Sequence, residues 1–245
     1  MAPSLLVGKV TDKKLITMKA KDISEIIKKL APPELAYEGE EIGFIVGDEN
    51  KEIAVVGVTE RPTTKVLQEA IVNKVDMLII HEPLYQSKKS FLVDAKFLSY
   101  PPNQKREELV KKGNFCVYRL HSEWDDAKDG NNDTLAKLLR LEVTDKLPYG
   151  RIGKIESISL QQFSELIKKS LGCKYVLVVG NKDKNINIVA VVAGSGNSLT
   201  EIIELAKQKG ADVLVSGDIQ DSRARFASEL DLALIDAGDY FTENP

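Results

Sequence analysis

The sequence predicts an α/β protein with two similar three-layer α/β domains from an internal duplication, and a metal cleft between them. The first observation is a gapless internal match between Ile53–Glu82 and Val189–Asp218. Each copy reads as apolar strand, polar turn, amphipathic helix and apolar strand. The second observation is that potential metal ligands follow the strands of both halves. Strands that alternate with helices indicate a mainly parallel sheet covered by helices on both faces.

The two halves also resemble each other downstream of the match, where another apolar strand leads into two potential ligands four residues apart. These pairs are His121 and Asp125 in the first half, and Asp239 and Glu243 in the second. In open parallel sheets, ligands bind beyond the carboxyl ends of the strands. We therefore expect both halves to place ligands in equivalent positions at one site.

The length of 245 residues is enough for two domains that each bury a core. We expect residues 1–146 to form the first domain, with 1–15 as an extension. Residues 147–245 form the expected second domain, whose C-terminal residues complete the site. The segment Thr144–Arg151 contains proline and glycine and is the expected connection.

Hydrophobic periodicity and turn residues predict the individual elements. In the first half they are a helix at Lys21–Leu30, strands at Gly43–Val46, Ala54–Val56 and Met77–Ile80, a helix from about Thr63 to Asn73, a loop with a short helix at Leu84–Tyr100, a helix at Gln104–Lys112 and a strand at Phe115–Leu120. In the second half they are helices at Gly130–Leu141 and Gln161–Ser170, and strands at Ile152–Leu160, Val176–Val179, Val189–Val192 and Val213–Val215. Asn132 or Asp133 is the expected cap of the helix at Gly130–Leu141.

Composition excludes several classes of protein. The net charge of −3 gives no basic field for nucleic acid or for an anionic membrane. Cys116 and Cys173 form no paired motif and are expected to be buried thiols. No apolar run reaches the roughly 18 residues of a membrane span, and the start has no signal-peptide layout. We expect a soluble cytoplasmic protein with a small-molecule substrate, if it has one.

The potential ligands have ordinary interpretations when each is taken alone. His81 and Glu82 follow an apolar strand, where a histidine bonded within a loop and a solvated glutamate are common. His121 and Asp125 could cap a turn and a helix, and an acidic chain end is usually solvated. Their repeated placement after strands favours a metal site. With both histidines better used as ligands, a Ser–His–Asp triad is not favoured.

A glycine-rich turn in the second half is a candidate anion site. Ser195 and Gly196 lie between a strand and a helix, where backbone N–H groups could bind phosphate or carboxylate. Arg61 lies in the matching turn of the first half. The alternative is a helix cap, since Ser198-Leu199-Thr200-Glu201 has the form of a capping box. The turn lacks the lysine of a nucleotide-binding P-loop.

Seven segments, in this order, resemble motifs of the Nif-three-like family, whose members are also called GTP cyclohydrolase I type 2 homologues. They are Lys21–Pro33, Glu40–Gly47, His81-Glu82-Pro83, His121-Ser122-Glu123-Trp124-Asp125, Gly150-Arg151-Ile152-Gly153, Gly194–Ser198 and Asp236–Glu243. The resemblance covers about Lys19 to Glu243. It implies two α/β domains, a site for two divalent metal ions at the domain interface, and a ring-shaped homohexamer. By position, it implies the ligands His81, Glu82, Asp125, Asp239 and Glu243, with His121 close by.

The chain departs from the family pattern at two ligand positions, where Glu82 and Asp239 stand in place of histidines. The family's Asp-Asn pair is also altered, to Glu40-Glu41. The remaining donors are oxygens apart from His81, which favours Mg²⁺ or Mn²⁺ over Zn²⁺ or Fe²⁺. The resemblance implies a metal-dependent hydrolase of the GTP cyclohydrolase type. The alternative is a non-enzymatic ring that binds metal or a partner through a degenerate site.

Overall fold

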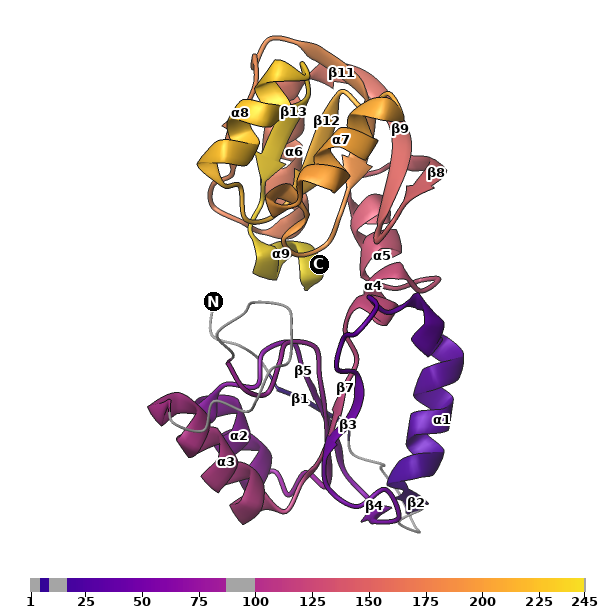
Figure 1. Cartoon of the computed structure of the whole chain (residues 1–245), viewed down its shortest axis with the longest axis vertical. Coiled ribbons are helices and arrows are strands. Elements are labelled where there is room, and N and C mark those ends of the chain that lie inside the picture. The colour runs from indigo at the N-terminus through magenta and orange to yellow at the C-terminus, as the bar shows by residue number, and fades with distance from the viewer. Residues whose placement is uncertain (1–4, 9–16, 87–99, 245) are drawn as a thin grey trace. The chain divides into compact units, whose positions relative to one another are not determined.

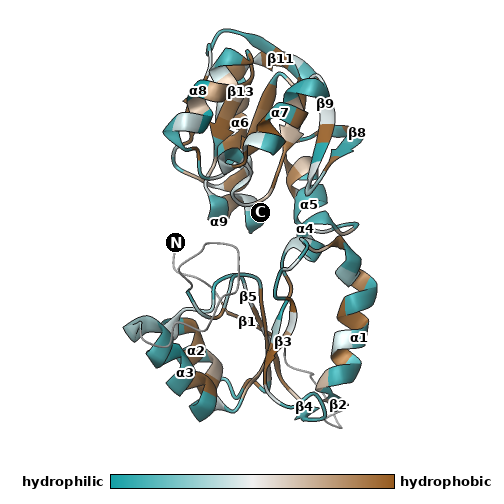
Figure 2. Ribbon diagram, viewed as in Figure 1, coloured by the Kyte–Doolittle hydropathy of each residue, from teal (hydrophilic) through white to brown (hydrophobic). Residues whose placement is uncertain are grey.

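The computed structural model describes residues 5–8, 17–86 and 100–244, which are drawn as ribbons in Figure 1. The chain divides into two compact units, Met1–Trp124 and Asp125–Pro245. Hydrophobic residues gather on the central strands of each unit, and the helices also carry hydrophilic residues (Figure 2). Each unit is thus an α/β structure with its own apolar core, as the sequence predicts.

The first unit contains a five-stranded sheet in the order β1-β5-β6-β7-β3. Its strands are β1 (Leu6–Gly8), β5 (Val56–Thr59), β6 (Met77–Ile80), β7 (Cys116–Arg119) and β3 (Gly43–Val46). The three central strands run parallel, and the edge strands β1 and β3 pair antiparallel to them. Two short strands, β2 (Met18–Lys19) and β4 (Glu52–Ile53), form a separate ribbon.

Helices cover both faces of this sheet, which gives the predicted three layers (Figure 1). The helices α2 (Thr64–Val72) and α3 (Pro101–Gly113) pack on one face through Leu67, Leu109 and Val110. The helix α1 (Ala20–Leu30) packs on the other face, where Ile27 meets Met77. A short 3₁₀ turn, η1 (Pro33–Leu35), follows α1.

The second unit contains a six-stranded sheet in the order β10-β13-β12-β11-β9-β8. Its strands are β8 (Glu142–Leu147), β9 (Gly150–Ser159), β10 (Leu177–Val179), β11 (Asn185–Val191), β12 (Val213–Ser216) and β13 (Ala233–Asp236). The strands β11, β12 and β13 run parallel and correspond to β5, β6 and β7. The flanking strands β9 and β10 pair antiparallel to them, as β1 and β3 do in the first unit.

This sheet is also covered on both faces. The helices α5 (Asn131–Leu138) and α6 (Leu160–Leu171) pack on one face, and α7 (Thr200–Gln208) and α8 (Asp221–Glu229) pack on the other. A complete capping box between Ser159 and Gln162 fixes the start of α6, and Gly172 ends it in the left-handed region. Short helices follow the last parallel strand of each half: α4 (Ser122–Asp126) and α9 (Asp239–Glu243).

The strand pairing confirms a duplicated architecture but corrects the gapless match in its first strand. Val56 lies opposite Met77 in the first unit, and Val189 lies opposite Val213 in the second. Val56 is therefore equivalent to Val189. The gapless match instead pairs Val56 with Val192, three residues further along the chain. The expected strand at Ala54–Val56 accordingly begins later, at Val56. The turn before α7 is longer than the turn before α2, which absorbs the shift.

Two aspartates with matching contacts support this correction. Asp76 Oδ2 accepts hydrogen bonds from the amides of Ala54 and Val55, both at 2.9 Å. Asp212 Oδ2 accepts the same two bonds, at 2.9 Å, from Asn187 and Ile188. Each aspartate thus fixes the two residues that precede the start of parallel pairing in its unit, at Val56 in β5 and at Val189 in β11.

Several expected elements differ from the structure. The helix expected at Gln104–Lys112 begins at Pro101, because proline is tolerated in a first helical turn. The segment Thr144–Arg151 is the β8–β9 hairpin and not a connection between domains. The units divide before the expected 146/147 boundary, because α5 and β8 pack with the second unit. Most of the expected loop and short helix at Leu84–Tyr100 lies outside the described residues.

The expected helix caps are also wrong. The residue before α5 is Gly130, and Asn132 and Asp133 lie inside the helix with their side chains bonded elsewhere. The residue before α7 is Leu199, and the Ser198 hydroxyl donates to the Ser195 carbonyl.

Within the described parts of the chain, none of the helices has the length and apolar character that a bilayer crossing requires.

Removing the carboxylate of Asp76 or of Asp212 should destabilise the protein. In Asp76→Ala or Asp212→Ala, two amides lose a charged acceptor, so we expect a loss of about 2–3 kcal/mol in unfolding free energy. Urea denaturation measures this loss. The exposed Glu229→Ala is the control and should change stability by less than about 0.5 kcal/mol. If Asp76→Ala or Asp212→Ala were as stable as Glu229→Ala, the stabilising role of that aspartate would be contradicted.

Candidate metal centre

The candidate ligands of both units lie just beyond the carboxyl ends of the central parallel strands. His81 and Glu82 follow β6, and His121 follows β7. Asp239 and Glu243 lie in α9, which follows β13. This is the edge at which parallel α/β sheets bind ligands, because the strands end there and the following loops converge.

The His81 side chain is buried and its tautomer is fixed. The residue is 8% exposed, and Nδ1 lies 2.9 Å from the carbonyl oxygen of Leu120. A carbonyl only accepts hydrogen bonds, so Nδ1 carries a proton, and in the neutral imidazole Nε2 then carries the lone pair. The Arg119 guanidinium donates to the His81 carbonyl at 3.1 Å and holds its backbone. This is the tautomer in which Nε2 of His81 could bind a metal ion.

His121 is held in the same way by a carboxylate, that of Glu40. The His121 Nδ1 donates to Glu40 Oε1, and Ser122 and Arg119 donate to the same carboxylate. The rings of His81 and His121 lie side by side, with centroids 4.6 Å apart. A carboxylate behind an imidazole orients the ring and raises its basicity as a ligand. The geometry therefore suits His121 to a ligand role as well as to the supporting role expected from the sequence.

The charges around Glu40 determine its protonation. Burial alone would raise the pKa of Glu40, whose side chain is 7% exposed. Hydrogen bonds from His121 and Ser122 and the charge of Arg119 outweigh burial, so the pKa lies below its usual value. Glu40 therefore remains an ionised acceptor for the His121 ring.

Glu60 is an acidic residue of this centre that the sequence analysis missed. It follows β5 directly, and the Glu82 amide donates to its backbone carbonyl at 2.9 Å. Arg61 pairs with one of its carboxylate oxygens, but among the described residues the other, Oε2, is buried without a hydrogen-bond partner. Burial raises the pKa of Glu60 to about 7, Arg61 opposes this rise, and the charge of Glu82 adds to it. A divalent cation would satisfy the buried oxygen and offset this repulsion, so the donor set fits a metal.

In the second unit, two asparagines of α5 hold Asp125. Asn131 donates to the Asp125 carboxylate at 2.7 Å, and Asn132 donates to the Asp125 carbonyl at 2.8 Å. Asn132 also donates to the Tyr149 carbonyl and accepts the Ala193 amide at 2.8 Å. Asp125 is 7% exposed and Asn132 is fully buried. Asn131 therefore fixes the Asp125 carboxylate, and Asn132 joins the Asp125 backbone to Ala193, beyond the end of β11.

Two glycines allow α9 to approach the strand ends closely. A Cβ at Gly194 would collide with the Glu243 carboxylate, and a Cβ at Gly217 would collide with the backbone of Asp239. The Gly194 amide also donates to Thr242 Oγ1 at 3.0 Å. Gly238 has a different role, since its φ of +89° provides the turn into α9.

Within each unit, the donor atoms lie close enough for pairs of them to bind one ion. In the first unit, His81 and His121 form one such pair, and Glu60 and Glu82 form another, with ligand atoms within 4.8 Å of one another. In the second unit, Glu243 lies within the same distance of Asp125 and of Asp239. Carboxylates at this spacing repel each other unless a cation or a proton lies between them.

The two pairs of potential ligands, His121 with Asp125 and Asp239 with Glu243, are not at equivalent positions as expected. The second pair lies one residue further along its half of the chain. Arg119 ends β7 opposite Ile80, and Asp236 ends β13 opposite Ser216. His121 is therefore equivalent to Gly238, and the ligand Asp239 lies one position further along. One residue corresponds to a rotation of about 100° on a helix, so the two pairs do not face the same way.

The turn expected to bind an anion makes internal contacts. The amides of Ala193, Gly194 and Ser198 donate to acceptors within the unit. A Cβ at Gly196 would collide with Val192, so this glycine also serves packing. Arg61 pairs with Glu60. Anion binding by Ser195, Gly196 and Arg61 remains a prediction that no contact in the structure tests.

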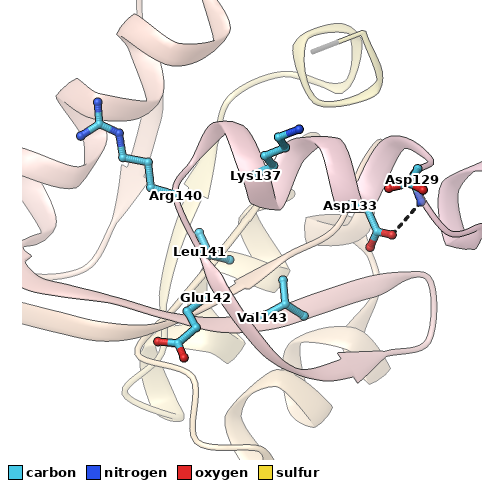
Figure 3. A pocket seen from close by; sticks show the side chains of 7 residues that line it. All are labelled: Asp129, Asp133, Lys137, Arg140, Leu141, Glu142 and Val143. Carbon is cyan, nitrogen blue, oxygen red and sulfur yellow. Dashed lines mark hydrogen bonds between the residues drawn. The ribbon is translucent and has the colours of Figure 1, made fainter.

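A surface cavity of about 610 Å³ between α5 and β8 is a separate candidate site. Figure 3 shows that the side chains of Lys137, Arg140 and Glu142 point in different directions. Asp133, at its other end, is paired with Arg151. The lining residues therefore do not converge on a common ligand.

Comparisons with known proteins show the family of the chain. Residues 18–245 match the model of the Duf34/NIF3 (NGG1p interacting factor 3) family. The chain belongs to this family. A Methanocaldococcus jannaschii relative named GTP cyclohydrolase 1 type 2 homolog is 35% identical, and the match covers 92% of this chain and 90% of the relative. A Clostridium acetobutylicum relative of the same name is 28% identical, with 94% and 87% covered.

Solved structures of the Duf34/NIF3 family share the fold. Reduced HcgD from Methanocaldococcus jannaschii superposes with a TM-score of 0.79 and 32% identity, covering 94% of this chain and 90% of that one. A Bacillus cereus protein related to NIF3 has a TM-score of 0.80 and 23% identity, covering 92% and 89%. The two α/β units predicted from the sequence are therefore the family fold.

The pKa of Glu40 predicts acid sensitivity. Because this pKa is lowered by folding, the stabilisation is present above the ordinary glutamate pKa of 4.5 and is lost as pH falls through the folded value. The wild-type protein should therefore lose unfolding free energy more steeply below pH ~4.5 than Glu40→Gln does. Urea denaturation across the acid range measures this, with the exposed Glu38→Gln as control. Parallel profiles for wild type and Glu40→Gln would contradict the assignment.

Proposed function

We propose that this Duf34/NIF3 protein binds divalent metal ions, two per chain, and uses them as a metal-dependent hydrolase. The observation that carries the proposal is the set of buried and half-buried donors at the strand ends, above all two imidazoles whose Nδ1 protons are held by Leu120 and Glu40. Imidazoles fixed in this way present Nε2 to a ligand. The close carboxylates of both units add the negative charge that a divalent cation requires.

The ligands we propose are His81, Glu82, Asp125, Asp239 and Glu243, with His121 and Glu60 as further donors. His81, Glu82, Glu60 and His121 belong to one unit, and the other three belong to the second. We propose that both units contribute to the same pair of ions. This is supported by the position of both donor sets at the carboxyl ends of equivalent parallel strands.

The chemistry that such ions supply is Lewis-acid catalysis, which lowers the pKa of a water molecule and neutralises oxygens of a phosphate or of a ring under attack. The chain's own residues would hold the ions, fix the imidazole tautomers and exclude bulk water from buried carboxylates. The relatives' name, GTP cyclohydrolase 1 type 2 homolog, suggests a purine nucleotide as the substrate class. This suggestion rests on the name of the relatives alone.

A second function, metal or partner binding without catalysis, is favoured by the replacement of two family histidines with Glu82 and Asp239. Loss of imidazole ligands weakens binding of Zn²⁺ and Fe²⁺. The two functions differ in a simple measurement. A hydrolase should co-purify with metal or be activated by Mn²⁺ or Mg²⁺, whereas a degenerate site should do neither.

Metal selectivity tests the proposal. The wild-type protein should bind Mn²⁺ or Mg²⁺ in preference to Zn²⁺, because most of its ligands are oxygens. Glu82→His combined with Asp239→His should shift this preference towards Zn²⁺ or Fe²⁺ by tenfold or more, as an order-of-magnitude expectation. Calorimetric titration of both proteins with Mn²⁺ and Zn²⁺ is the measurement.

The same titration has a pH dependence. Glu60 has a pKa of about 7, so a proton competes with the metal at and below neutral pH. The affinity for the metal should therefore fall as pH drops through 7.

Glu229→His, at an exposed helical position, is the control for the histidines added in the double variant. If the natural protein binds neither ion while the double variant binds Zn²⁺, the site is degenerate and catalysis is the wrong function.

We also propose that the chain forms a homo-oligomer, a hexamer by its family resemblance. Light scattering at micromolar concentration should then give about six times the chain mass of 27.1 kDa. A mass near that of one chain would contradict this proposal, without bearing on metal binding.

A further inference from the structure

Arg151 is a fully buried charged residue that is not among the proposed metal ligands. Most of its contacts are with the segment that follows Asp125. The residue is 1% exposed and lies in β9. Its guanidinium pairs with Asp126 at 2.6 Å and with Asp133 at 2.5 Å. It also donates to the backbone carbonyls of Asp126, Ala127 and its neighbour Gly150. Apart from Gly150, these acceptors lie in residues 126–133, the segment that follows the ligand Asp125 and includes the first turn of α5.

This segment fixes Asp125 through two further side chains. Asn131 and Asn132, which begin α5 beside Asp133, donate to the Asp125 carboxylate and to its carbonyl. Arg151 therefore holds both sides of the Asp125 segment, since it binds the residues that follow Asp125 and the helix that supplies its two hydrogen-bond donors. A planar guanidinium can form this set of directed bonds, whereas a lysine ammonium provides only a point charge.

The same network reaches the second acidic ligand. Asn132 accepts the Ala193 amide, and the next residue, Gly194, donates to Thr242 beside Glu243. The Asp125 and Glu243 oxygens lie within 4.8 Å of each other, where like charges repel. A rigid support is needed to hold two carboxylates at this distance before a cation arrives.

We propose that Arg151 is a positioning residue of the metal centre, which holds Asp125 in ligand geometry through Asn131 and Asn132. The proposal rests on the proposed metal-binding function. The site geometry in the second unit is then set by a buried guanidinium in β9 and exists before the ion binds. Arg151 itself touches no ion.

Mn²⁺ titration of a double-mutant cycle tests this. Arg151→Lys should weaken Mn²⁺ binding by roughly tenfold to a hundredfold, the usual effect of removing a support behind a metal ligand. In an Asp125→Asn background, the same change should have little further effect, because its target is already lost. Arg225→Lys, at an exposed position of α8, is the control and should leave binding unchanged. Equal losses in both backgrounds would overturn the proposal, because they would indicate a general structural role.

A second variant covers the case in which Arg151→Lys does not fold. Asn132→Asp has the same shape and keeps an acceptor for the Ala193 amide, but it loses the donor to the Asp125 carbonyl. It should weaken Mn²⁺ binding by a similar factor. Wild-type affinity in Asn132→Asp would overturn the proposal.

Amide hydrogen exchange of the metal-free protein gives a readout that is independent of binding. Arg151→Lys, or Asn132→Asp in its place, should accelerate exchange at Asp129 and Gly130, whose amides bond to Asp133 and Ala127 within the clamped segment. Exchange in β12 should stay unchanged. Acceleration throughout the second unit would overturn the proposal. If the wild type binds no metal but exchange changes only in this segment, the proposed function fails while the positioning of the segment stands.

Discussion

Repulsion between closely spaced acidic oxygens is the constraint on which the rest of the centre depends. Glu60 and Glu82 approach within 4.8 Å in the first unit, and Glu243 comes within the same distance of Asp125 and Asp239 in the second. Folding does not bring buried carboxylates together without a compensating charge, a proton or a rigid support. Glu60 is an example, since its burial and, to a smaller extent, the charge of Glu82 raise its pKa to about 7.

The duplicated fold supplies the rigid support. In each unit, three parallel strands run side by side, and Asp76 or Asp212 fixes the two residues before parallel pairing begins. Buried arginines then bind the ligand segments: Arg119 bonds to the His81 carbonyl and to Glu40, and Arg151 bonds to the residues after Asp125. The two units therefore use the same elements, although the ligands themselves are of different types.

Much of the fold could be predicted from the sequence, because apolar periodicity and turn residues specify buried strands and covering helices. The three-residue shift between the copies could not, since the apolar residues shared by their first strands fit several registers equally well. The ligand segments were predicted because they follow strands. Glu60 follows β5 in the same way and could have been found by that rule, whereas Glu40 could not, because its contact with His121 joins segments 81 residues apart. Asn131 and Asn132 were missed as supports because an asparagine near a helix start usually indicates a cap.

The central proposal is that ligands of both units bind the same divalent ions. Crystals grown with Mn²⁺ and measured at the manganese absorption edge test it directly, because anomalous scattering locates the ions without assumptions about the ligands. The account predicts two peaks a few ångströms apart, at roughly 3.5–4 Å, bound by His81 of the first unit together with Asp125 and Glu243 of the second. The absence of any peak, or peaks bound by the residues of one unit alone, would contradict it.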